Sequence, residues 1–256
     1  MKPLALALLV SGTALAATPV STQEALRLAG SALQSLWEQL SNVDCVESVQ
    51  QIKLGPNGKV TYRQDSSFDY LVALQLNGGD ILVEESRVPI VKHEDRKTAS
   101  LLLTNGFSTL ALIFHPAFQS AFEYSAPTAV EIQGKSLLAV QFRHVPGARS
   151  PSVLKLTNRD YPVDWQGSAW IDPTQGAIVR ISASLMPGME DLGLKTLTAD
   201  VRYSRVTFKD QPASYWLPET AAIEVETAHQ HWRNIHTFDQ YKVFAVDVNT
   251  KTEVPK

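Results

Sequence analysis

The stretch 167-GSAWIDPTQGAIVRISASL-185 predicts two antiparallel strands that fold back on a short turn. The turn is Asp172-Pro173-Thr174-Gln175-Gly176, in which proline presets a turn dihedral and glycine supplies the positive φ that closes it. Apolar side chains fall on both faces of this hairpin, with Ala169 and Ile171 alternating with Trp170. The segment therefore predicts a sheet whose two faces are both at least partly covered.

The segments around the hairpin also have strand character. In 194-LKTLTADVRYSRVTF-208, the residues that should share one face are Leu197, Ala199, Val201 and Tyr203, and those on the other face are Thr196, Thr198, Asp200 and Arg202. Short apolar runs separated by turn signals predict three or four more strands between residues 44 and 91, and others over residues 129–145, 220–229 and 236–248. An antiparallel meander accounts for all of these segments.

Two blocks have helical spacing instead. Residues 21–43 place apolar side chains three and four positions apart, and Ser21 with Glu24 forms a capping box at the start. A second block begins at Asp95, is interrupted by Asn105-Gly106, and continues as a helix from Ser108 to Phe114 that Pro116 should end. The predicted fold class is therefore α+β, with one curved antiparallel sheet, an unclosed β-barrel, and both helical blocks packed on its concave face.

Composition indicates where the protein works. The apolar run in residues 1–16 ends in Ala14-Leu15-Ala16, which predicts a signal peptide followed by one domain over residues 17–256, in the periplasm or outside the cell. The net charge is −3 and there is no block of lysine and arginine, so nucleic acid is disfavoured as a partner. No segment is apolar for long enough to span a membrane. Cys45 is the single cysteine and is expected to be a small buried hydrophobe.

The motifs of known catalytic sites do not occur in the sequence. There is no G-x-S-x-G elbow, no Gly-rich phosphate loop and no cysteine beside a histidine. We therefore expect no cofactor and no enzymatic activity, although distant strands could still assemble a site.

The order of the motifs resembles the superfamily of periplasmic lipoprotein carriers, the LolA-like proteins with the RseB and LppX groups. The signal peptide and amphipathic helix are followed by strands, a helical insertion, and then 170-WIDPTQGAIVRISASL, 199-ADVRYSRVTF, 215-YWLPETAAIEVET and 238-FDQYKVFAV. The resemblance implies helices that plug an unclosed barrel and a cavity that holds acyl chains or another apolar ligand. The block around residues 107–122 and the loop at 144–166 have no counterpart in the carriers, and the central block is also similar to a group of exported bacterial proteins.

Under this hypothesis, bulky apolar residues of the helices and the sheet line the cavity, and they are Trp37, Leu110, Phe114, Phe118, Trp170 and Val201. The alternative is that each belongs to an ordinary hydrophobic core. Arg143 and Arg149 are candidates to hold the headgroup of a lipid, since a guanidinium can grip a carboxylate or phosphate. The alternative for them is an exposed loop that contacts water.

Two other functions remain open at this stage. As an RseB-like envelope sensor, the protein would bind a protein partner through the loop at residues 144–166. As a metal-dependent hydrolase, it would use His229 and His231, which share one side of a strand, with His236 as a third ligand. The alternative for the histidines is an ordinary strand edge that faces solvent.

Overall fold

The computed structural model describes residues 20–39, 42–77, 80–90, 110–156, 159–187, 193–209 and 213–243. The predicted signal peptide and the predicted helix that begins at Asp95 lie outside these ranges. Within them, no helix is both long and apolar enough to cross a bilayer.

One large antiparallel sheet dominates the part of the chain that the structure describes. Its strand order is β3-β2-β1-β13-β12-β11-β10-β9-β6-β4, with β5 paired to β6. The strands are β1 (Asn42–Leu54), β2 (Val60–Asn77), β3 (Asp80–Pro89), β4 (Phe122–Tyr124), β5 (Thr128–Ile132), β6 (Lys135–His144), β9 (Trp165–Ile171), β10 (Ile178–Leu185), β11 (Leu194–Thr207), β12 (Ser214–Thr227) and β13 (His231–Val243).

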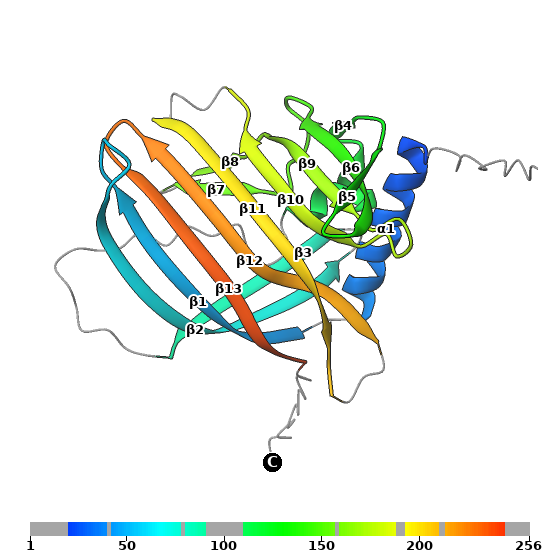
Figure 1. The fold of residues 1–256 in the computed structure, drawn as a ribbon, viewed down its shortest axis with the longest axis horizontal. Coiled ribbons are helices and arrows are strands. Elements are labelled where there is room, and N and C mark those ends of the chain that lie inside the picture. Colours follow the sequence, from blue (N-terminus) through cyan, green and yellow to red (C-terminus); the bar gives the residue numbers. More distant parts are fainter. Residues whose placement is uncertain are drawn as a thin grey trace, which may run out of the picture.

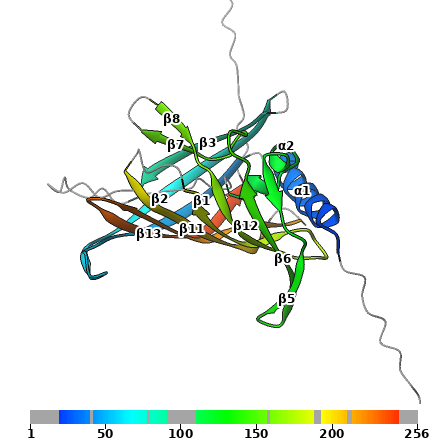
Figure 2. The same cartoon turned by 90° about the horizontal axis from the view of Figure 1, so that it is seen from above.

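The sheet is open and strongly curved. The strands run diagonally across the molecule, with helix α1 (Thr22–Gln39) at one end of the sheet (Figure 1). Seen from above, the sheet bends so that β3 lies on the same side as the two helices (Figure 2). The predicted curved, unclosed antiparallel sheet with an N-terminal helix and a central helical insertion is therefore confirmed.

Local chemistry explains where α1 begins and ends. The Glu24 amide donates to Ser21 Oγ at 3.1 Å, as the capping box predicts, but the Glu24 carboxylate pairs with Arg27 instead of turning back to Ser21. The predicted helix extended to Val43, whereas the strand β1 already begins at Asn42. Val43 is fully buried and pairs with Val72 and Val243, so cross-strand packing prevails over helical spacing at that point.

In the described part of the central insertion, from residue 110 onward, the helical structure is divided in two. A 3₁₀ turn, η1 (Ala111–Phe114), is followed by the short helix α2 (Pro116–Gln119). Pro116 does not end a helix here: it begins α2, because the first helical position needs no backbone N–H. His115 caps this helix through Nδ1, which accepts from the Ala117 amide at 3.2 Å.

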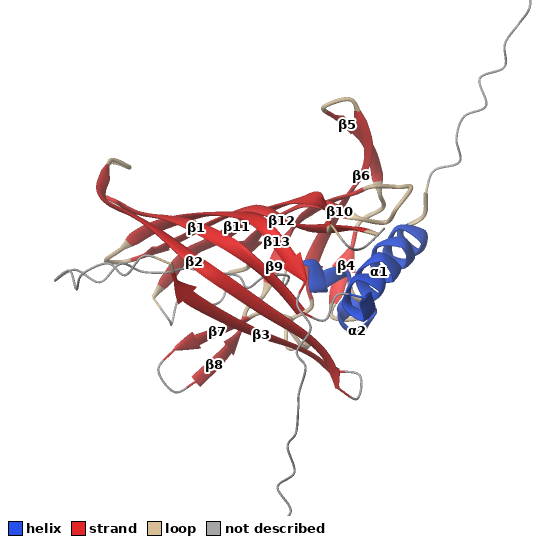
Figure 3. Cartoon of the chain, turned by 90° about the horizontal axis from the view of Figure 1, so that it is seen from below, coloured by secondary structure: helices blue, strands red, loops and turns tan. Residues whose placement is uncertain are grey.

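The segment predicted as a loop over residues 144–166 contains a further hairpin. Strands β7 (Val153–Leu156) and β8 (Arg159–Pro162) form a separate two-stranded sheet. This hairpin lies on the same side of the main sheet as β3 (Figure 3).

Among the contacts that hold α1 against the rest of the fold, two involve backbone carbonyl groups of the helix. On one side, Gln119 Nε2 donates to the Leu26 carbonyl at 3.0 Å and to the Phe114 carbonyl at 2.8 Å. On the other side lies the β9–β10 turn predicted from the sequence, in which Gly176 has φ +67°. An added Cβ at Gly176 would lie 2.3 Å from the Leu28 carbonyl oxygen, so the turn and the helix backbone are in direct contact. The β9–β10 turn thus also forms part of the surface against which α1 packs.

Candidate ligand-binding site

A pocket opens beside α1, next to the face of the helix that packs into the core. The fully buried stripe of α1 consists of Ala25, Ala29, Leu33 and Trp37, four residues apart. Ala32 and Leu36 precede two of these residues and are only partly buried. Because they lie beside the stripe, their side chains form a wall of the pocket instead of filling the core.

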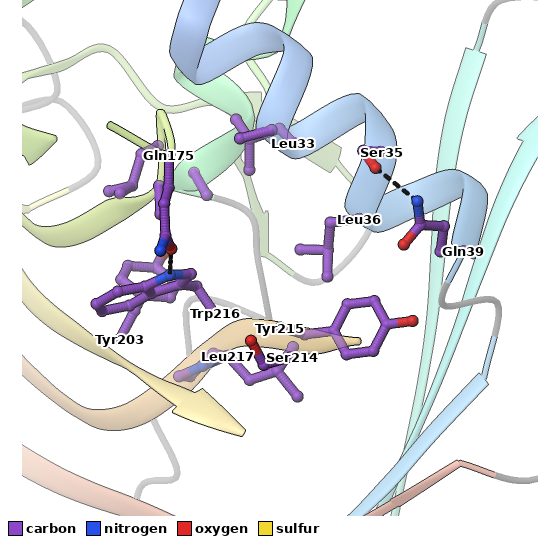
Figure 4. Close-up of a pocket in the computed structure, with 15 residues that line it drawn as sticks. Leu33, Ser35, Leu36, Gln39, Gln175, Tyr203, Ser214, Tyr215, Trp216 and Leu217 are labelled. Atoms are coloured by element: carbon purple, nitrogen blue, oxygen red, sulfur yellow. Dashed lines mark hydrogen bonds between the residues drawn. The ribbon is translucent and has the colours of Figure 1, made fainter. Parts of the chain in front are cut away.

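The pocket has a volume of about 240 Å³ and lies between α1 and the first residues of β12 (Figure 4). It is lined by Ala32, Leu33, Ser35, Leu36 and Gln39 of α1, Ala111 of η1, Gln175, Ala177 and Ile178 around the β9–β10 turn, Tyr203 of β11, and Ser214, Tyr215, Trp216, Leu217 and Pro218 of β12. None of these described lining residues is charged. The site suits an apolar group.

The polar groups in the pocket wall are neutral. Trp216 Nε1 donates to Gln175 Oε1 at 3.0 Å, and Gln39 Nε2 donates to Ser35 Oγ at 2.8 Å. Burial raises the pKa of Tyr203, so its hydroxyl stays protonated at neutral pH. These groups can orient a ligand through hydrogen bonds, but the pocket itself offers no ionic partner.

The shape of the sheet explains why space remains here. β10 pairs with β11 up to Arg180 and Arg202, so beyond Arg202 the strands β11 and β12 continue as a two-stranded ribbon. The register shifts directly afterwards, where Glu219 of β12 is the extra residue of a β-bulge. Such a bulge bends a strand and increases its twist. A straight helix cannot follow a bending ribbon, and the opening forms between them.

Five of the six residues predicted to line the cavity are buried in the core instead. Trp37, Leu110, Phe114, Phe118 and Val201 are at most 6% exposed, and none lines this pocket. Phe114 packs against the rings of Tyr124 and Phe142, with ring centroids 5.4 and 5.9 Å apart. The alternative of ordinary core packing therefore describes these five residues.

Trp170 does not line this pocket either, but it lines a second cleft, on the opposite face of the sheet. Ala169 and Ile171 are fully buried on the inner face of β9, so Trp170 between them points to the outer face. There the Arg180 guanidinium lies over its ring, 4.8 Å from the ring centroid. Trp170 cannot line the concave side, because neighbouring residues of a strand face opposite sides of the sheet.

The two headgroup candidates do not line the pocket. Arg143 is exposed on β6, opposite Glu123 and Gln166, and lines a shallow depression on the outer face. Arg149 lies in the following loop, with its guanidinium 5.0 Å from the ring centroid of Phe118. The structure brings neither to the apolar pocket.

The three histidines are not brought together either. His229 lies in the β12–β13 turn, and His231 Nε2 contacts Glu224 Oε1 at 2.6 Å on the outer face. His236 is buried on the inner face. It follows His231 by five positions, and side chains an odd number of positions apart on a strand face opposite sides of the sheet. Among the described residues, no group of three or more His, Cys, Asp or Glu side chains is placed to hold a metal ion.

His236 instead belongs to a buried ionic cluster that sequence reasoning missed. The Glu47 side chain is completely buried, and its carboxylate contacts Arg87 Nε at 2.5 Å and His236 Nδ1 at 2.8 Å. Arg87 also lies over the Tyr70 ring, 4.1 Å from its centroid. The partners of Glu47 are 40 and 189 positions away in the chain, so no local pattern could have indicated them.

This cluster makes stability depend on pH. Burial by itself would raise the pKa of Glu47, but the hydrogen bonds with His236 and Arg87 outweigh it and hold that pKa below its ordinary value. The stabilisation is therefore complete above the unfolded pKa of about 4.3 and is lost as the pH falls through the lower folded pKa.

We expect Glu47→Gln to be less stable than the wild type at pH 7. The difference should shrink as the pH falls below the unfolded pKa of about 4.3, where the carboxylate is protonated first in the unfolded state and then, at its lower folded pKa, in the native state. Urea denaturation at pH 7, 5, 4 and 3 measures this difference. A difference that stays constant down to pH 3 would contradict the assignment.

Cys45 is buried as predicted, with 1% of its surface exposed. Burial and the nearby carboxylates raise the pKa of its thiol to about 12. The thiol therefore stays protonated at neutral pH and packs as a small hydrophobe.

The chain is similar to several proteins of known structure. No family model and no curated protein matches the chain. A DUF1329 family protein from Desulfovibrio piger is similar at 9% identity and a TM-score of 0.46, over 89% of this chain and 93% of that one. A proposed outer membrane lipoprotein-sorting protein domain from Vibrio parahaemolyticus is similar at 10% identity and a TM-score of 0.43, over 90% and 94%. MucB, solved in complex with MucA, is similar at 9% identity and a TM-score of 0.22, over 88% and 99%.

Proposed function

We propose that this chain is an exported, non-enzymatic binding protein that holds a lipid acyl chain or another apolar ligand in the pocket between α1 and β12. The observation that supports this function is the absence of charge among the described residues of a pocket walled by Leu33, Leu36, Ile178 and Leu217. An apolar ligand in such a site loses contact with water without removing any ion from water.

The size of the pocket limits what it can hold. Its volume of about 240 Å³ is roughly eight times the ~30 Å³ that one water molecule occupies in the liquid. If each methylene group occupies about one such volume, a single saturated chain of medium length fits the pocket better than a sterol or a second chain. The predicted signal peptide supports a role for this binding outside the cytoplasm.

The binding test uses a neutral amphiphile, so that charge plays no part. We expect dodecanol to displace an apolar fluorescent dye from the protein, and we expect Leu36→Trp to weaken dodecanol binding at least tenfold, because the larger ring occupies the pocket. Ser31→Trp, on the exposed side of the same helix, is the matched control and should bind like the wild type.

Thermal denaturation shows whether both variants keep the fold. If dodecanol does not bind the wild type, or if Leu36→Trp binds it as well as Ser31→Trp does, the pocket is not the binding site.

A further inference from the structure

A second cleft lies on the outer face of the sheet, beneath the β5–β6 hairpin. It has a volume of about 500 Å³ and lies between the hairpin and the strands β10, β11 and β12. Figure 3 shows the hairpin projecting from this face, away from β3 and the β7–β8 pair. In contrast to the pocket beside α1, this cleft is lined by four basic side chains, from Lys135, Arg180, Arg202 and Arg205, and by two acidic ones.

The arrangement of the arginines is unfavourable for folding. Arg180 and Arg202 are directly opposite each other on the neighbouring strands β10 and β11. Like charges in this position destabilise a sheet. Asp200 offsets part of the repulsion: its carboxylate receives the Arg180 guanidinium at 2.5 Å, but lies 3.9 Å from Arg202. One carboxylate is thus shared between two guanidinium groups.

The third arginine of the cleft, Arg205, is hydrogen-bonded to an uncharged side chain. Arg205 donates from Nε and Nη2 to the hydroxyl of Ser214, at 3.1 and 2.6 Å. The Arg202 side chain is 57% exposed, so it can turn toward a ligand without breaking a buried contact. An anion in the cleft would relieve the repulsion between Arg180 and Arg202 and could accept bidentate hydrogen bonds from a guanidinium.

The cleft and the apolar pocket share a wall. Gln175, Tyr203 and Trp216 line both. The hydrogen bond from Trp216 to Gln175, which Figure 4 shows, joins two of these shared residues. It therefore stands at the boundary between the uncharged pocket and the arginine-lined cleft. A ligand that extended past this boundary would meet apolar walls at one end and positive charge at the other.

We propose that the ligand is an anionic amphiphile, with one alkyl tail in the pocket beside α1 and a carboxylate or phosphate headgroup in the cleft formed by Arg180, Arg202 and Arg205. This inference rests on the proposed function, to which it adds the chemical class of the ligand. The headgroup site differs from the one predicted at Arg143 and Arg149, neither of which lines either cavity.

The test compares ligands that share a twelve-carbon tail, each kept below its critical micelle concentration. Laurate has a carboxylate, dodecyl phosphate a phosphate, and dodecanol no charge, while inorganic phosphate has no tail. At low salt we expect at least one of the anions to bind about tenfold more tightly than dodecanol. The tighter anion distinguishes a fatty acid from a phosphate lipid as the source of the headgroup.

Variants connect this preference to the cleft. The double variant Arg202→Gln, Arg205→Gln should lose the tenfold preference for the anion and keep the dodecanol affinity. Arg202→Lys should keep most of the preference for the anion. Arg63→Gln is the matched control, because Arg63 is similarly exposed at 55% but lies on β2 and lines neither cavity. A salt titration should reduce the preference in the wild type and in the Arg63→Gln control, and should have no effect on the double variant.

The outcomes separate the two proposals. If dodecanol binds as tightly as both anions and the double variant changes nothing, the anionic headgroup is wrong and the apolar pocket stands. If no amphiphile binds, the proposed function itself fails. If inorganic phosphate binds as tightly as dodecyl phosphate, and Leu36→Trp leaves dodecyl phosphate binding unchanged, then no ligand spans the shared wall and the inference is overturned.

Discussion

Glu47→Ala will lower the free energy of unfolding by about 3–5 kcal/mol, because it leaves the Arg87 guanidinium and His236 in the interior without their shared carboxylate. The Glu47 side chain is completely buried and that of Arg87 is 14% exposed, so water cannot replace the lost contacts well. The three residues belong to β1, β3 and β13, and their contacts join one end of the sheet to its middle.

Urea denaturation at pH 7 measures the loss. The control is Glu24→Gln, which removes a carboxylate that also pairs with an arginine, but on the exposed surface of α1. Exposed pairs contribute little to stability, so this control should unfold like the wild type. Equal stabilities of Glu47→Ala and Glu24→Gln would show that the buried cluster does not stabilise the fold.

Gly176→Ala has the second largest expected effect, because it combines backbone strain with a steric clash. A residue with a Cβ in the left-handed region, here at φ +67°, costs about 1–2 kcal/mol. In addition, the new Cβ would lie 2.3 Å from the Leu28 carbonyl oxygen, so either the turn or α1 must move. We expect a total loss of about 3 kcal/mol or more.

Gly147→Ala separates these two causes. Gly147 has a similar φ of +80°, and an added Cβ would meet nothing within 4 Å. It should therefore lose only the 1–2 kcal/mol of backbone strain. Gly176→Ala should also weaken dodecanol binding, since α1 and Gln175 both line the pocket, whereas Gly147→Ala should not. Equal losses in both variants would mean that the turn does not hold the helix.

Elements whose energetics are local were predictable from the sequence. The start of α1 at Ser21 depends on one side chain and an amide three residues later. The β9–β10 turn depends on Asp172 Oδ1, which accepts from the Thr174 and Gln175 amides, and on the positive φ of Gly176. In β11, the predicted inner residues 197, 199, 201 and 203 are all buried, because period-2 alternation follows from strand geometry.

The positions of other residues depend on contacts that the sequence does not show. Alternation shows that Trp170 faces away from Ile171, but a sequence with apolar side chains on both faces does not indicate which side becomes concave. Similarly, the helical spacing of α1 includes both Leu36 and Trp37, yet only the packed structure shows that Trp37 is buried in the core and that Leu36 lines the pocket. The curvature of the sheet decides both questions, and it arises from pairing between distant strands.

The sequence by itself determined the fold class, the hairpin and the beginning of α1, because each follows from interactions among residues a few positions apart. Only the tertiary structure decided the two cavities, which combine residues of α1, β5–β6 and β9–β12, and the Glu47 cluster, whose partners lie 40 and 189 positions away. The physical reason is that strand register and sheet curvature bring these side chains together, and both are set by the summed packing of the whole sheet.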